Sequence, residues 1–121
     1  MGDMICTAVN GDETIDSFVR AKYLIVYDEN KKELAVQIRN PAVVKNKGKK
    51  GFVRECISLK ANVILVPHGS LTYGCNRMLK KAGIKVLVVD PGEHFLKART
   101  RKPSFMEILY STLKREPVEK K

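Results

Sequence analysis

The sequence contains no tryptophan, only three cysteines and no long apolar run. A membrane-spanning helix needs about 18 consecutive apolar residues, and no stretch approaches that length. The N-terminus also lacks the basic start and apolar stretch of a signal peptide, so we expect a cytoplasmic protein. Cys6, Cys56 and Cys75 form neither a CxxC pair nor a zinc-finger spacing. We therefore expect no disulfide framework and structural roles for Cys6 and Cys56.

Acidic residues are also scarce: there are 13, against 23 lysines and arginines, and the net charge is +10. Such an excess of positive charge suits nucleic acid or an anionic ligand, but it also occurs on the solvated surface of a lysine-rich, stable domain. No aromatic residues are interleaved with the lysines, so base stacking is poorly supported. If nucleic acid binds, the candidate contacts are Lys45, Lys47, Lys49, Lys50, Arg54, Arg99, Arg101 and Lys102.

Residues 61–92 form the unit around which the chain is organised. Val63 to Val66 and Ile84 to Val89 are short apolar runs typical of buried strands. Between them, one face of a predicted helix carries Leu71, Cys75, Met78, Leu79 and Ala82. Gly83 stands where a helix C-cap glycine is expected. Two buried strands joined by a helix predict a parallel βαβ unit.

The remaining segments predict one domain over residues 1–121, with its core at about 4–115. Further strands are expected at 4–9, 23–27 and 34–39, the last two joined as a hairpin. Further helices are expected at 52–60 and 103–115, the second beginning with a capping-box pair, Ser104 and Glu107. Residues 43–51 should be flexible and charged, and residues 116–121 a frayed tail.

This order of elements predicts a three-layer α/β/α fold. The five-stranded mixed sheet should have the strand order 3-2-1-4-5, with helices on both faces. Ligands of open α/β sheets bind where strands end and connections diverge. That rule predicts a crevice between the ends of the first and fourth strands, lined by Asn10, Gly11, Asp12, His68, Gly69, Ser70, Gly74 and Asp90.

His68 is the most interesting side chain of this predicted crevice. Its imidazole could bind iron or an anion, or it could simply hydrogen-bond the turn. Cys75 could be a soft metal ligand beside it, although its helical spacing also suits a small buried core residue. No nucleophile, base and orienting group can be assembled, and neither a Walker loop nor the carboxylate set of a nuclease is present. We therefore predict that the protein is not an enzyme.

Two segments, TIDSFVRAKYLIVYDENKKE and LKKAGIKVLVVD, resemble the dinitrogenase iron–molybdenum cofactor biosynthesis family. This family includes NifX-like proteins and the C-terminal domain of NifB-like proteins, and the resemblance extends over about Ile5 to Ala98. Ser17-Phe18-Val19 replaces the family's His-Phe-Gly, so the family histidine is missing. Gly69 and Gly74 match glycines of the family's turn after the fourth strand.

The resemblance implies an RNase H-like fold and, for the nitrogenase branch, carriage of iron–sulfur or iron–molybdenum precursor clusters between assembly proteins. The hypothesis is therefore a small cytoplasmic, NifX-like binding or carrier protein. Its ligand would be such a cluster or another anionic species in the crevice, with His68 and Cys75 as metal contacts and cluster-assembly proteins as partners. The alternative hypothesis is a basic module associated with nucleic acid.

Overall fold

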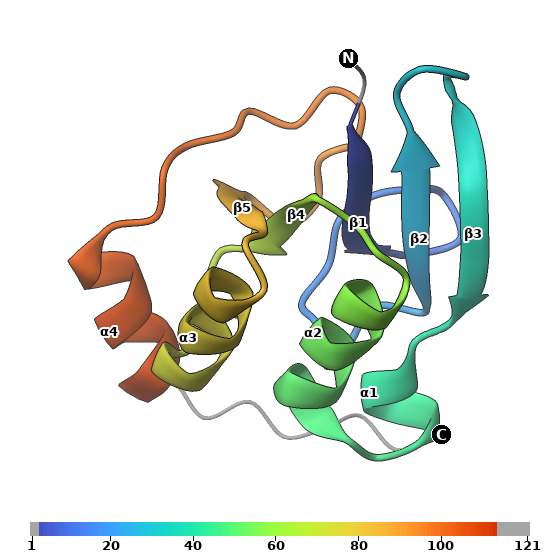
Figure 1. Cartoon of the computed structure of the whole chain (residues 1–121). Coiled ribbons are helices and arrows are strands. Elements are labelled where there is room, and N and C mark those ends of the chain that lie inside the picture. The colour runs from blue at the N-terminus through green and yellow to red at the C-terminus, as the bar shows by residue number, and fades with distance from the viewer. Residues whose placement is uncertain (1–2, 114–121) are drawn as a thin grey trace.

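Five strands form one mixed sheet in a computed structural model that describes residues 3–113 (Figure 1). The strands are β1 (Met4–Val9), β2 (Tyr23–Asp28), β3 (Glu33–Arg39), β4 (Val63–Pro67) and β5 (Lys85–Val89). Their order is β3-β2-β1-β4-β5. β1 pairs antiparallel with β2 and parallel with β4, while β4 and β5 are also parallel. The predicted strand order and the mixed character of the sheet are confirmed.

Four helices are described: α1 (Pro41–Val44), α2 (Gly48–Ser58), α3 (Tyr73–Lys81) and α4 (Phe105–Leu113). None of these described helices has the length and apolarity to cross a membrane. The prediction that residues 43–51 are flexible was wrong, since they contain the end of α1 and the start of α2. α1 forms because Asn40 caps it, accepting a hydrogen bond from the Ala42 amide, and a proline follows at the first position. The predicted tail at 116–121 lies outside the described residues.

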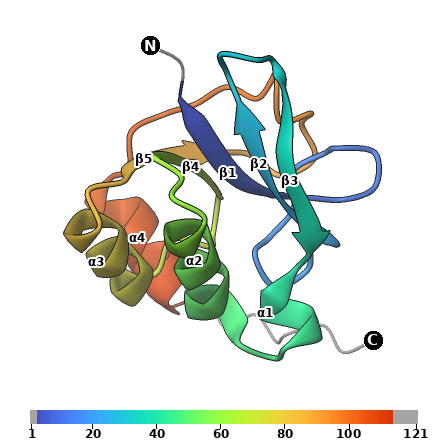
Figure 2. The same cartoon turned by 45° about the vertical axis from the view of Figure 1, so that its right-hand side comes forward.

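All four described helices pack on one face of the sheet, as Figures 1 and 2 show. The expectation of helices on both faces is therefore incorrect for this part of the chain. The strand order explains the difference. The connection from β3 through α2 to β4 and the one from β4 through α3 to β5 move across the sheet in the same direction. Right-handed crossovers that advance in one direction place their helices on the same face.

The sheet separates two apolar cores because successive side chains of a strand point to opposite faces. The larger core lies under the helices and includes the stacked rings of Phe18 and Phe52, whose centroids are 4.3 Å apart. The smaller core is covered by loops, from which Ile15 and Phe95 pack against the other face. The sheet that positions the polar loops at the strand ends is therefore packed against a core on each face.

Cys6 of β1 and Cys56 of α2 form a disulfide, with their Cα atoms 5.9 Å apart. The expectation that the cysteines form no disulfide framework did not foresee this bond, through which Cys6 and Cys56 have the structural role predicted for them. The two residues are 50 positions apart in sequence, so no local spacing pattern indicates the pairing. They meet because Cys6 points to the helix-covered face, where α2 presents Cys56 to the same core.

Candidate functional site

The turn after β4 carries a cluster of polar side chains joined by hydrogen bonds and ion pairs. His68 follows β4 immediately, and its Nδ1 atom lies 2.6 Å from Oε1 of Glu107 on α4. The Gly69 amide donates to the other oxygen of that carboxylate at 3.0 Å. Gly69 has a φ of +89°, a conformation that glycine adopts at little cost. The turn therefore directs an imidazole and a main-chain N–H at one carboxylate.

Glu107 is held as a buried anion. Its side chain is only 7% exposed, and Ser111, one turn further along α4, donates a third hydrogen bond at 3.0 Å. Burial by itself raises the pKa of Glu107, but the hydrogen bonds from His68, Gly69 and Ser111 outweigh it and lower the pKa below its usual value. The carboxylate is thus ionised at neutral pH and fixes α4 to the β4 turn.

Arg101 extends this cluster to the end of β5. Its guanidinium lies 3.1 Å from Asp90 and 3.7 Å from Glu107. The position of Arg101 is set by two backbone hydrogen bonds with Val88, of 2.7 and 2.9 Å, which attach the segment after β5 to the edge of the sheet. Of the predicted crevice residues, Asp90 therefore belongs to the His68 cluster, as an ion-pair partner.

The ring of His68 stacks on Tyr110, with centroids 4.8 Å apart and an interplanar angle of 8°. Its side chain is 42% exposed. The hydrogen bond at Nδ1 favours the tautomer with its proton on that nitrogen, which leaves the Nε2 lone pair for another partner. The arrangement of a carboxylate, a histidine and an open second nitrogen is the one in which proteins commonly present a metal-binding imidazole.

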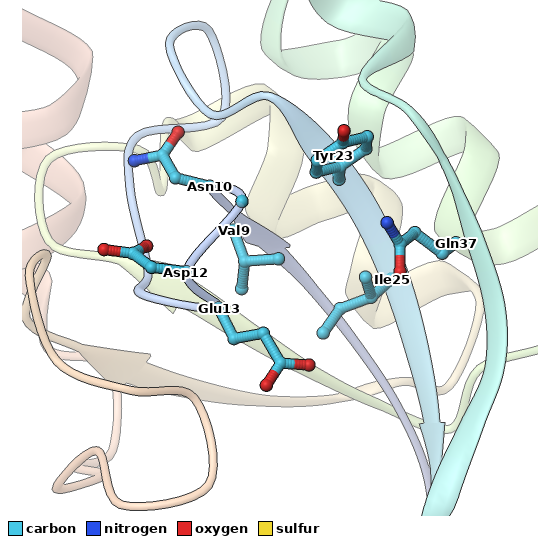
Figure 3. A pocket seen from close by; sticks show the side chains of 8 residues that line it. Val9, Asn10, Asp12, Glu13, Tyr23, Ile25 and Gln37 are labelled. Carbon is cyan, nitrogen blue, oxygen red and sulfur yellow. The ribbon is translucent and has the colours of Figure 1, made fainter.

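The predicted residues of the β1 loop line a different space, shown in Figure 3. Asn10, Gly11 and Asp12 border a cavity of about 220 Å³, together with Val9, Glu13, Tyr23, Ile25 and Gln37. Hydrogen bonds from the Thr14 hydroxyl and amide lower the pKa of Asp12 and hold its carboxylate within its own turn. This cavity lies on the loop-covered face, because its strand side chains belong to that face.

The two halves of the predicted crevice are therefore not one site. His68 points to the helix-covered face, where it meets α4, while the residues of the β1 loop open onto the other face. Residues 16–18 connect the two regions. Asn10 donates to Asp16 at 3.1 Å, and the Phe18 amide donates to the Ser70 hydroxyl at 3.3 Å. Ser70 is fully buried, so its role is to anchor this connection rather than to face a ligand.

Cys75 does not join His68. Its side chain is fully buried in the helix-side core, and burial raises the pKa of its thiol, which disfavours the thiolate that would bind a metal. In the part of the chain that the structure describes, no three histidine, cysteine or acidic residues form a group that could hold a metal ion. Of the predicted pair, only His68 has a partly exposed side chain.

The predicted nucleic-acid residues are dispersed. Lys50 and Arg54 border a groove between α2 and α3, which they share with Gly74 of the predicted crevice. Lys49 donates to the Gly69 carbonyl at 3.3 Å, and Arg101 is ion-paired as described above. Four others lie exposed on the α1–α2 connection and on the segment before α4: Lys45, Lys47, Arg99 and Lys102.

Sequence reasoning missed Glu107 as a site residue. Its pattern with Ser104 correctly predicts the helix start, since the Ser104 hydroxyl accepts from the Glu107 amide at 3.2 Å. The carboxylate, however, turns to His68 and Gly69. Phe105, the first residue of α4, is 76% exposed and does not anchor the helix. The contacts of Glu107 with His68 and Gly69 depend on the position of α4 beside the turn after β4, and no local sequence pattern predicts that position.

No protein-family model matches this sequence, and a search of curated proteins finds no significant match. The site must therefore be judged on its own chemistry. It offers one oriented imidazole and an arginine, and it lies at the edge of the sheet where β1 and β4 end.

Proposed function

We propose that the protein is a small, NifX-like binding or carrier protein whose cargo is an iron–sulfur or iron–molybdenum-type cluster or another anionic species. His68 would be the protein ligand to this cargo. The observation that carries the proposal is the 2.6 Å contact of Nδ1 with Glu107 on a side chain that is 42% exposed. A carboxylate in that position orients the imidazole and fixes its tautomer.

The charge of the chain supports an anionic cargo. The net charge is +10, and Arg101 lies beside Glu107 within the same cluster. A positive surface attracts anions and repels free cations, so a preassembled anionic cluster is a better match than a bare metal ion. The resemblance to the cofactor biosynthesis family points the same way. The RNase H-like relationship belongs to this proposal and is supported by the strand order β3-β2-β1-β4-β5.

A single oriented imidazole suits a carrier. One protein ligand holds a cluster loosely, and the remaining coordination positions stay open to thiols or to a cluster-assembly partner. Transfer between proteins requires this kind of exchange. The proposed role is one of binding without catalysis. The Ser111 hydroxyl of the cluster donates to Glu107, so it supports the carboxylate that orients the imidazole.

The test is an anaerobic titration of the full chain with a preformed anionic iron–sulfur cluster, followed by visible absorption and circular dichroism. We expect saturable binding in the parent protein and in Cys75→Ala, and its loss in His68→Ala. His94→Ala is a matched control, because His94 also contacts a glutamate, with its Nε2 atom 3.2 Å from Glu13, but on the loop-covered side. Absence of binding, or equal binding by His68→Ala and the parent, would rule out this site.

A further inference from the structure

A second site lies between α2 and α3, on the helix side of the molecule. The groove there has a volume of about 290 Å³ and is lined by Lys50, Arg54, Gly74, Arg77, Met78 and Lys81. Four of these six residues are cationic, two from each helix, and none is acidic. The groove therefore gathers more positive charge than a single carboxylate ligand would neutralise.

The placement of these cations costs stability. Lys50 and Arg54 are four residues apart on α2, as are Arg77 and Lys81 on α3. Like charges at this spacing repel each other by about 0.2–0.5 kcal/mol per pair. Lys50 also lies in the first turn of α2, which has no acidic residue and where the helix dipole disfavours a cation.

No ion pair among the described residues relieves this repulsion, although Lys81 lies in the last turn of α3, where the helix dipole favours a cation. Lys50, Arg54 and Lys81 form no ion pair with any described residue, and Arg77 lies over the ring of Tyr73, 5.9 Å from its centroid. A bound polyanion would relieve the repulsion within both helices at once.

Gly74 gives the Lys50 side chain room to lie across the start of α3. A Cβ atom at Gly74 would stand 2.7 Å from Cε and 3.2 Å from Nζ of Lys50. Gly74 lies in the first turn of α3, so the absence of a Cβ atom leaves space at the point where the lysine of one helix reaches the other.

We propose that the α2–α3 groove binds phosphate groups, supplied either by a nucleic-acid backbone or by a free polyphosphate. Arginine guanidinium groups match phosphate oxygens with paired hydrogen bonds, while the lysines add point charges. The site is separate from His68 and independent of any cluster cargo. It shares Lys50 and Arg54 with the nucleic-acid residues predicted from the sequence, and adds Arg77 and Lys81.

The experiment compares two variants that each lose two positive charges. Arg54→Gln/Arg77→Gln alters the groove, and Lys31→Gln/Lys32→Gln alters the turn between β2 and β3, at the opposite end of the sheet from the helices (Figure 1). Thermal melts by circular dichroism establish that both are folded. The probes are a labelled single-stranded oligonucleotide, followed by fluorescence anisotropy over a salt series, and inorganic pyrophosphate, followed by calorimetry.

We expect the groove variant to lose about tenfold or more in affinity for the probe that binds, a loss typical of removed phosphate-binding arginines. For the oligonucleotide, the slope of log K against log salt should shrink by about 1.4, since each phosphate contact contributes about 0.7 with single strands. Binding of pyrophosphate alone would identify a free polyphosphate as the ligand. The proposal is overturned if neither probe binds, or if both variants weaken binding equally, because affinity would then follow net charge rather than the groove.

Discussion

Removal of the Glu107 carboxylate is the most informative perturbation of the apoprotein. This group accepts hydrogen bonds from His68, Gly69 and Ser111 at 2.6, 3.0 and 3.0 Å, and it fixes α4 to the turn after β4. Glu107→Ala would leave the buried Gly69 amide without its acceptor. Glu107→Gln keeps the shape of the side chain and one acceptor oxygen, but removes the charge.

The expected magnitudes follow from these contacts. A hydrogen bond to a charged group contributes about 1.5–3 kcal/mol, and a buried amide left without a partner costs about 1–3 kcal/mol. His68 and Ser111 are partly able to reorient or to reach water, so the losses are not additive. We expect Glu107→Ala to lower the free energy of unfolding by about 2–4 kcal/mol, and Glu107→Gln by about 1–2 kcal/mol, near neutral pH.

The pH dependence of the unfolding free energy distinguishes the effect of the Glu107 charge from the effect of its side-chain shape. The pKa of Glu107 is lower in the folded protein than its usual value near 4.5. The carboxylate therefore contributes its full stabilisation above that value and loses it as the pH falls through the folded pKa. Below that point, the protonated glutamic acid resembles glutamine. The difference in unfolding free energy between the parent and Glu107→Gln should accordingly be largest near pH 7 and shrink toward pH 3.

Urea denaturation of the metal-free protein, followed by circular dichroism between pH 3 and pH 7, measures this difference. Glu33→Gln is the control, because Glu33 is an exposed residue at the start of β3. If both Glu107 variants unfold within about 0.5 kcal/mol of the parent, as typical surface substitutions do, the carboxylate does not hold α4 in place. A difference that stays constant with pH would show that the charge is not its basis.

Three further predictions concern the supports of the site. Asn40 is fully buried, and its amide nitrogen donates to the Phe18 and Ala21 carbonyls, both at 2.8 Å. We expect Asn40→Ala to lower the free energy of unfolding, measured in urea titrations, by about 2–4 kcal/mol. Thr72 caps α3 by accepting from the Cys75 amide at 3.2 Å, and Thr72→Ala should cost about 1 kcal/mol, whereas Thr72→Ser should cost much less. Replacing both cysteines of the Cys6–Cys56 disulfide by serine should lower the free energy of unfolding by about 2–4 kcal/mol. Detection of three alkylatable thiols in the unreduced, denatured parent protein would show that this disulfide does not form.

The strands could be predicted because their signals are local. β1, β4 and β5 are short apolar runs with clear turn residues beyond them, and the alternation in β3 marks a half-exposed strand. The parallel pairing of β4 with β5 follows from the rules for βαβ connections. The same rules also place α2 and α3 on one face, so that error came from assuming a symmetric three-layer architecture rather than from a missing signal.

The site was less predictable because its parts come from distant segments. His68 could be found, since it directly follows a buried strand. Glu107 lies 39 residues later, and the capping-box pattern predicts a local partner for its carboxylate, the Ser104 amide. Tertiary contacts decided between these two uses. The Cys6–Cys56 pairing depends in the same way on contact across the core, between residues whose spacing carries no pattern.

The distribution of charge between the two faces links the proposed sites. The loop-covered face has the carboxylates of Asp12 and Glu13 around its cavity. The helix-covered face has the four cations of the α2–α3 groove and the His68 cluster, in which Arg101 lies beside Glu107 and Asp90. Lys49 connects the two sites on the helix side, because it lies in the first turn of α2 and donates to the Gly69 carbonyl. The attraction of an anion to the cations of either site is screened over about 10 Å at 0.1 M salt. Encounter with both sites should weaken together as salt rises, and only substitutions within each site will distinguish them.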